Sequence, residues 1–152
     1  MARKLTLKLF GKDTQKLVED VAAKVKVNKI TLDEAQRLVS EATAKDPYFD
    51  YKTHFIDIVA MPPADNRSGN SGADIRVINR IIEKIENADR DFVTLEDTPY
   101  SFLANRVSRF TGWSTNNRIL NRYIEQFLDD VANAEEVNIA KLVEVKKSGT
   151  SE

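Results

Sequence analysis

The stretch that decides the fold class is residues 75–97, IRVINRIIEKIENADRDFVTLED. In its first part, isoleucines recur at three- and four-residue spacing, at Ile75, Ile78, Ile81, Ile82 and Ile85. This spacing predicts an amphipathic helix with one apolar face. The short apolar run FVTL, residues 92–95, follows a polar segment and predicts a brief extended stretch. We therefore expect a fold that mixes helices with a small amount of sheet.

Further helical patterns follow this stretch. Thr94 with Asp97 or Thr98 predicts the start of a helix. Its apolar face would comprise Phe102 or Leu103, Val107 and Phe110. The longest apolar stripe of the chain comes next, at Ile119, Leu120, Tyr123, Ile124, Phe127, Leu128 and Val131. It predicts a long helix with a broad apolar face.

The first third of the chain predicts a strand and a helical hairpin. Leu5, Leu7 and Leu9 alternate with polar residues, which is typical of a half-buried strand, and Gly11 would end it. A first helix is then predicted behind Asp13 or Thr14, with the apolar face Leu17, Val18, Val21 and Val25. Thr31 and Glu34 fit a capping box. The apolar face of that second helix is Leu32, Ala35, Leu38, Val39 and Ala42.

The whole chain is expected to be α+β and mainly helical, with about five helices. The sheet would use the N-terminal strand, a central strand over HFIDIVAMPP, residues 54–63, and a C-terminal strand after Ala134. The apolar residues of that last segment could instead dock on a partner. We expect one domain over residues 1–145, with an internal loop at 64–74 and a disordered tail at 146–152.

Composition excludes several classes of function. The 152 residues can bury one core, and the net charge of −1 points to no particular class of partner. The absence of cysteine excludes disulfides, thiolate nucleophiles and cysteine metal sites. No apolar run approaches the roughly 20 residues that span a bilayer. We expect a cytoplasmic protein that does not bind a membrane.

No catalytic or cofactor motif is evident. His54 is the single histidine, and Asp57 would lie on the opposite face of a strand there. A calcium loop starting at Asp89 would need glycine where Thr94 stands. The GNSG segment, residues 69–72, matches no phosphate-binding motif. We therefore expect no enzyme activity, no cofactor and no metal.

The candidate binding site is a local cluster of arginines. No acidic residue lies between Asp97 and Glu125, whereas four arginines do. The candidate residues for binding a partner or nucleic acid are Arg106, Arg109, Trp113, Asn117, Arg118 and Arg122. Spacing of three or four places the arginines in pairs on helix faces, suited to carboxylate or phosphate groups.

Two interpretations of FTGWSTNNRIL, residues 110–120, stay open. In the first, Gly112 ends one helix, Trp113 packs in the core or as a hydrophobic staple, and Ser114 or Thr115 caps the next helix. The arginines would then meet an acidic or anionic protein partner. In the second, residues 114–122 form the recognition part of a helix-turn-helix DNA-binding regulator. The spacing argues against this interpretation, because Ser108 occupies the position at which the motif has its turn glycine and Gly112 comes four residues later.

The order of elements carries a resemblance to a known group of proteins. It rests on residues 74–110, where the isoleucine-rich helix ends near IENA before LED, and on NRYIEQFLDDVANAEE, residues 121–136. Over residues 75–136 the chain resembles small accessory proteins of tailed bacteriophages. The resemblance implies a protein that binds other proteins, in virion assembly or in antagonising a host factor. It implies a location in the host cytoplasm or the virion. The partner we expect is a protein, with self-association as one form of this binding.

Overall fold

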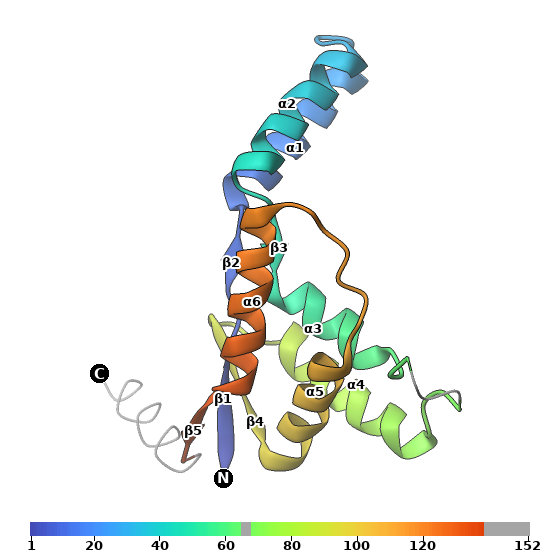
Figure 1. The fold of residues 1–152 in the computed structure, drawn as a ribbon, viewed down its shortest axis with the longest axis vertical. Coiled ribbons are helices and arrows are strands. Elements are labelled where there is room, and N and C mark those ends of the chain that lie inside the picture. Colours follow the sequence, from blue (N-terminus) through green and yellow to red (C-terminus); the bar gives the residue numbers. More distant parts are fainter. Residues whose placement is uncertain (65–67, 139–152) are drawn as a thin grey trace. The chain divides into compact units, whose positions relative to one another are not determined.

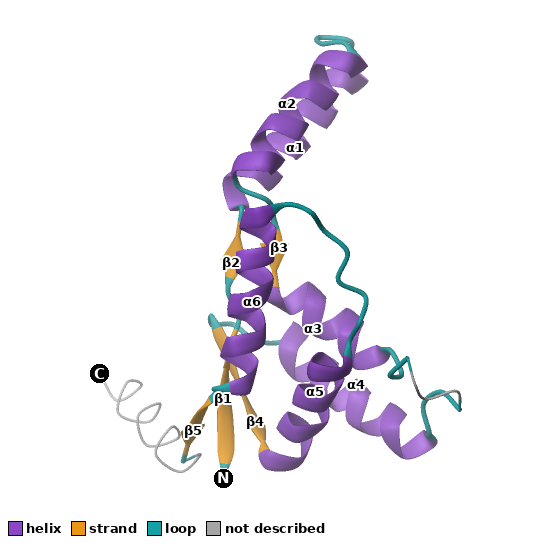
Figure 2. Cartoon of the chain, in the orientation of Figure 1, coloured by secondary structure: helices purple, strands orange, loops and turns teal. Residues whose placement is uncertain are grey.

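A computed structural model describes residues 1–64 and 68–138. Over these ranges the chain forms six helices and five short strands, so the α+β, mainly helical prediction is confirmed (Figures 1 and 2). The chain divides into two compact units. Among the described residues, the sheet unit comprises 1–8, 51–64, 68–113 and 127–138, and the hairpin unit comprises 9–50 and 114–126. None of the described helices is long and apolar enough to cross a membrane.

The sheet unit contains a three-stranded antiparallel sheet. Strand β1 (Ala2–Thr6) lies between β4 (Phe92–Glu96) and β5 (Glu135–Val137). The register places Leu5 opposite Val93, and all of Leu5, Val93 and Leu95 are buried on one face. The extended segment predicted from FVTL is therefore the strand that pairs with the N-terminus. Central and C-terminal strands both exist, although the central one is not where it was expected.

Three helices and the end of a fourth belong to the sheet unit: α3 (Tyr51–Ala60), α4 (Gly72–Glu86), α5 (Asp97–Arg109) and part of α6 (Arg118–Ala132). The isoleucine stripe of α4 is confirmed, because Ile78, Ile81 and Ile85 are buried. A capping box formed by Ser71 and Asp74 starts this helix. Its first isoleucine, Ile75, is 45% exposed.

The strand predicted over residues 54–63 is wrong, because this segment forms most of α3. Its β-branched and aromatic residues favour a strand by composition. Their positions favour a helix, since Tyr51, Phe55, Ile58 and Val59 are buried together on one helical face. Pro62 and Pro63 end the helix instead of a strand. On this helix His54 and Asp57 are three residues apart, so they do not lie on opposite faces.

Aromatic side chains fill the core beside α3. The ring centroid of Phe127 lies 4.9 Å from that of Tyr51 and 4.8 Å from that of Phe55. The Tyr51 hydroxyl donates a 2.7 Å hydrogen bond to Asp130, which also pairs with Lys8 at 2.9 Å. Burial and this hydrogen bond raise the pKa of Tyr51.

The hairpin unit is built on two antiparallel helices, α1 (Lys12–Lys26) and α2 (Leu32–Lys45). The helical hairpin is confirmed, and the Thr31 hydroxyl accepts a hydrogen bond from the Glu34 N–H at 3.2 Å as predicted. The start of α1 is not at Asp13 or Thr14, because Gly11 is its N-cap residue.

Gly11 allows the backbone at the start of α1 to lie against the backbone that follows α2. Its φ is +69°, and an added Cβ would lie 2.3 Å from the backbone oxygen of Pro47. Only glycine tolerates both conditions. The strand expected through Leu9 is split here, because β1 ends at Thr6 and β2 (Leu9–Phe10) pairs instead with β3 (Phe49–Asp50).

Several domain-level predictions remain untested. The loop predicted at 64–74 lies within the sheet unit, and its residues 65–67 fall outside the described part. The terminal strand beyond Asn138 and the tail at 146–152 also fall outside it. A single domain over residues 1–145 stays a prediction.

Candidate protein-binding groove

The four arginines of the predicted cluster are distributed over the two units. Arg106 and Arg109 belong to α5 in the sheet unit, whereas Arg118 and Arg122 belong to the part of α6 in the hairpin unit. Each pair must therefore be considered in its own surroundings.

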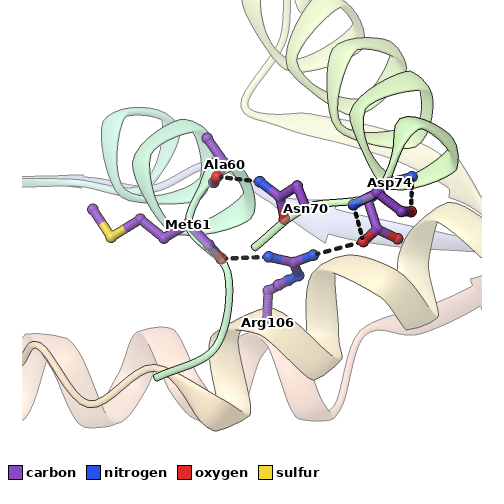
Figure 3. A network of polar contacts seen from close by, with 6 residues as sticks. Ala60, Met61, Asn70, Asp74 and Arg106 are labelled. Carbon is purple, nitrogen blue, oxygen red and sulfur yellow. Dashed lines mark hydrogen bonds and ion pairs between the residues drawn. The ribbon is translucent and has the colours of Figure 1, made fainter. Parts of the chain in front are cut away.

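Arg106, one of the candidate binding residues, is buried and already has partners within the chain. Its side chain is only 6% exposed, and its guanidinium donates to the Met61 carbonyl and faces the Asp74 carboxylate at 3.7 Å (Figure 3). The guanidinium also lies 4.7 Å from the centre of the Phe102 ring. The acidic partner comes from a distant segment, which a count of nearby charges in the sequence cannot detect.

The contacts around Arg106 hold the start of α4 beside the end of α3. Asn70 donates a 2.9 Å hydrogen bond to the Ala60 carbonyl, next to the Met61 carbonyl that Arg106 uses (Figure 3). Asp74 serves at once the capping box of α4 and the ion pair with Arg106. Arg106 therefore has a structural role. Arg109 is exposed in the last turn of α5, where a positive charge is favourable for the helix dipole.

Trp113 packs among aromatic rings, but its side chain is half-buried and lies outside the fully buried core. Its ring centroid is 5.8 Å from that of His54, 4.9 Å from Phe110 and 5.9 Å from Phe127. His54 is thus part of an aromatic cluster. Gly112 does not end α5, because the C-cap residue is Phe110. A Cβ on Gly112 would lie 2.3 Å from the end of the Phe110 ring, so a larger residue there would displace that ring.

Asn117 caps α6, a role that was predicted for Ser114 or Thr115. Its side-chain oxygen accepts hydrogen bonds from the N–H groups of Ile119 at 2.9 Å and Leu120 at 3.1 Å. Its amide nitrogen donates to the Thr43 carbonyl at 3.0 Å, which ties α6 to the end of α2. These bonds engage both ends of the Asn117 amide inside the protein.

The link between α5 and α6 is longer than the turn of the helix-turn-helix motif, which was the alternative interpretation of residues 114–122. Residues 110–117 connect α5 to α6, whereas that motif uses a turn of about three to four residues. Arg118 and Arg122 are exposed in the first turns of α6 and have no ion pair among the described residues. DNA binding by these arginines stays an untested prediction.

A second candidate site lies on the hairpin, as an open groove of about 440 Å³ between α1 and α2. All of its lining residues come from these two helices: Val18, Val21, Ala22, Val25, Leu32, Ala35, Gln36, Val39 and Ser40. Val21 and Ala35 are buried. Leu32 is 61% exposed at the start of α2. Apart from Gln36 and Ser40, every lining side chain is apolar.

A more polar depression continues the groove at the turn of the hairpin. It is lined by Val25, Asn28, Lys29, Ile30, Thr31, Leu32 and Glu34. Val25 and Leu32 line both hollows. Asn28 has a φ of +60°, which lets the chain reverse there. The hollow surface therefore extends from the middle of the hairpin to its turn, and it becomes more polar toward the turn.

Sequence patterns identified these side chains as helical but did not identify the groove. The sequence of α1 did contain evidence for the groove. Val18, Ala22 and Val25 form a second row of apolar side chains along the helix, beside the row that includes the buried Val21. A single neighbouring helix covers one such row, so the second row predicts a further contact. In the same way, Leu32 and Gln36 lie beside Ala35 in α2.

No protein-family model, curated protein or solved structure compared with the chain matches it. Among the described residues, no group of histidine, aspartate and glutamate side chains is arranged to hold a metal ion.

Proposed function

We propose that this protein acts without catalysis, by binding another protein through the groove between α1 and α2. The observation that carries the proposal is the exposed apolar wall of the groove, above all Leu32 at 61% exposure. Exposed apolar surface bordered by polar residues is typical of protein interaction sites.

The shape and chemistry of the groove favour an amphipathic helix as the occupant. Two parallel walls of side chains, contributed by antiparallel helices, leave a channel in which a third helix can pack. The small side chains of Ala22 and Ala35 leave room for apolar side chains of the incoming helix. Such a helix would present apolar residues at positions i, i+3 or i+4, and i+7.

The biological setting of the proposal rests on the resemblance of residues 75–136 to phage accessory proteins. In that setting the protein would serve virion assembly or antagonise a host factor, in the host cytoplasm or in the virion. Arg118 and Arg122 remain candidates for contacts with carboxylate or phosphate groups. A DNA-binding regulator remains the alternative, and it rests on these two exposed arginines.

Partner capture with matched variants tests the proposed function. The full chain and its Leu32→Glu variant are immobilised, and the host proteins that they retain are identified by mass spectrometry. Each retained host protein is then purified, and its affinity for the original chain and for the variant is measured. Glutamate at this first position of α2 suits the helix dipole, so the fold should persist. Ala23→Glu adds the same charge at an exposed position of α1 outside the groove lining and serves as control.

We expect Leu32→Glu to weaken partner binding at least about tenfold, because a charge would enter an apolar contact. Ala23→Glu should leave the affinity within about twofold of the original. Equal affinities for the original chain and Leu32→Glu, with every retained partner, would refute the groove as the binding surface.

A further inference from the structure

We propose that the helices which occupy the groove are α1 and α2 of a second copy of this chain. The two hairpins would face each other around a twofold axis and form an antiparallel four-helix bundle. This inference rests on the proposed function, since it names the partner of the same groove.

Gln36 favours a second copy over an unrelated apolar helix. It lies near the middle of the α2 side of the groove, between Leu32 and Val39. An amide both donates and accepts hydrogen bonds, so two Gln36 side chains related by a twofold axis can bond each other. An apolar partner stripe would leave this amide unpaired, at a cost in free energy. Paired polar residues within an apolar bundle also determine its register.

The α1 side of the groove is symmetric about Ala22. Val18 lies four residues before Ala22 and Val25 lies three residues after it. With the axis passing near Ala22, Val18 would meet Val25 of the partner subunit. The small, exposed Ala22 side chain would let the two α1 helices approach closely.

The same twofold axis would pair opposite charges that lie beside the groove on the two copies. On α1, the exposed Glu19 and Lys26 lie three residues before and four residues after Ala22, on one line of the helix. An antiparallel pairing would place Glu19 opposite Lys26 of the partner subunit. Among the described residues neither Glu19 nor Lys26 has an ion pair within the chain.

The rim of α2 repeats this arrangement. Asp33 and Arg37 are exposed and four residues apart, on either side of the level of Gln36. Their midpoint is Ala35, one residue before Gln36, so an axis that crosses α2 between Ala35 and Gln36 would bring Asp33 near Arg37 of the partner subunit. Among the described residues Arg37 pairs with Glu41, at 3.6 Å and with both side chains mostly exposed, so it can turn to a second carboxylate. A twofold interface brings the same surface of two copies together, so that surface must be complementary to itself. The charges on both rims of the groove meet this requirement.

The size of the surface predicts a reversible dimer. A face two helices wide and about 22 Å long, at 1.5 Å of rise per residue, would bury on the order of 1,000 Å² in total. Stable specific interfaces begin near this value. We therefore expect the degree of association to change with protein concentration.

Sedimentation velocity of the full chain over a range of concentrations tests the inference. We expect a monomer–dimer equilibrium that Glu19→Lys weakens at least about tenfold, because two lysines would face each other. The double variant Glu19→Lys/Lys26→Glu should return the dissociation constant to within about threefold of the original. Reversal on both copies restores the pairing only when the partner is the same chain. Circular dichroism confirms that both variants keep their helix content.

Each other outcome counts against the inference. A chain that stays monomeric at every concentration overturns it, as does a dimer that Leu32→Glu leaves intact or one that the double variant fails to restore. The proposed function is judged separately: a captured host protein whose affinity falls with Leu32→Glu supports it even when the chain is monomeric. If the chain is monomeric and its captured partners bind the Leu32→Glu variant with unchanged affinity, both the proposed function and the further inference are refuted.

Discussion

The helix α4 in the sheet unit and the α1–α2 pair in the hairpin unit carry similar apolar stripes, yet the two regions bury them to very different extents. Ile81 and Ile85 of α4 are fully buried, whereas Leu32 of α2 is 61% exposed. In both regions the spacing of three and four residues predicted the helices correctly. The spacing shows which face of a helix is apolar, but it does not show what covers that face.

The two regions also differ in what fills them. Large rings pack around Phe127 in the sheet unit, whereas the buried apolar residues of α1 and α2 are the smaller Val21 and Ala35. Truncation of a large buried side chain leaves a cavity, whereas a partly exposed valine leaves almost none. Stability should therefore depend far more on the aromatic core than on the walls of the groove.

The largest effect is expected for Phe127→Ala. Phe127 is fully buried and contacts the rings of Tyr51 and Phe55, so its loss should lower the free energy of unfolding by about 3–5 kcal/mol. Val25→Ala, in the groove wall, should cost about 1 kcal/mol or less. Urea unfolding followed by circular dichroism measures both. Similar costs for the two variants would show that the groove wall is covered within the folded chain.

Arg106→Ala should have the next largest effect. Its removal leaves the Met61 carbonyl without the guanidinium donor and the Asp74 carboxylate without its ion-pair partner, so we expect a loss of about 2 kcal/mol. The exposed neighbour Asn105 provides the control, since Asn105→Ala should change stability by less than about 0.5 kcal/mol. An Arg106→Ala protein as stable as the control would return this arginine to the list of candidate binding residues.

Arg106 also shows where inference from sequence ends. The sequence predicted most helices and the capping role of Thr31, because these depend on neighbouring residues. It could not foresee the pairing of Arg106 with Asp74, because the two residues meet only through the fold. The helix α3 was mistaken for a strand because its composition was given more weight than its spacing. The groove was missed because exposure depends on which elements pack together.

Tyr51→Phe should have a smaller effect that depends on pH. Burial and the hydrogen bond to Asp130 raise the pKa of Tyr51 above its unfolded value of 10.0. The folded state therefore favours the protonated phenol, and this stabilisation is present below pH 10 and is lost as the pH rises further. The variant should lose about 1 kcal/mol at pH 7.

Above pH 10 the stability of the original chain should fall more steeply than that of Tyr51→Phe, so the difference between them should shrink. Urea unfolding of both proteins between pH 7 and about 11 measures this difference. Other titrating groups are common to both proteins and cancel in it. A difference that stays constant over the whole range would show that the phenol is not held protonated by the fold.

The smallest effect on stability is expected for Arg118→Ala with Arg122→Ala, which sharpens the contrast between the exposed arginines of the hairpin unit and the buried Arg106. Both residues are exposed in α6, so the double variant should keep the free energy of unfolding within about 0.5 kcal/mol. An early thermal melt would instead show that these arginines support the fold.

The same double variant separates the two functional interpretations. If the groove alone carries binding, the double variant should retain its partner while Leu32→Glu loses it. Titration of mixed-sequence duplex DNA at two salt concentrations examines the alternative, because phosphate contacts require an affinity that falls as salt rises. We expect no salt-dependent DNA binding by the original chain. Salt-dependent binding that disappears in the double variant would establish the DNA-binding interpretation, with Arg118 and Arg122 as its phosphate contacts.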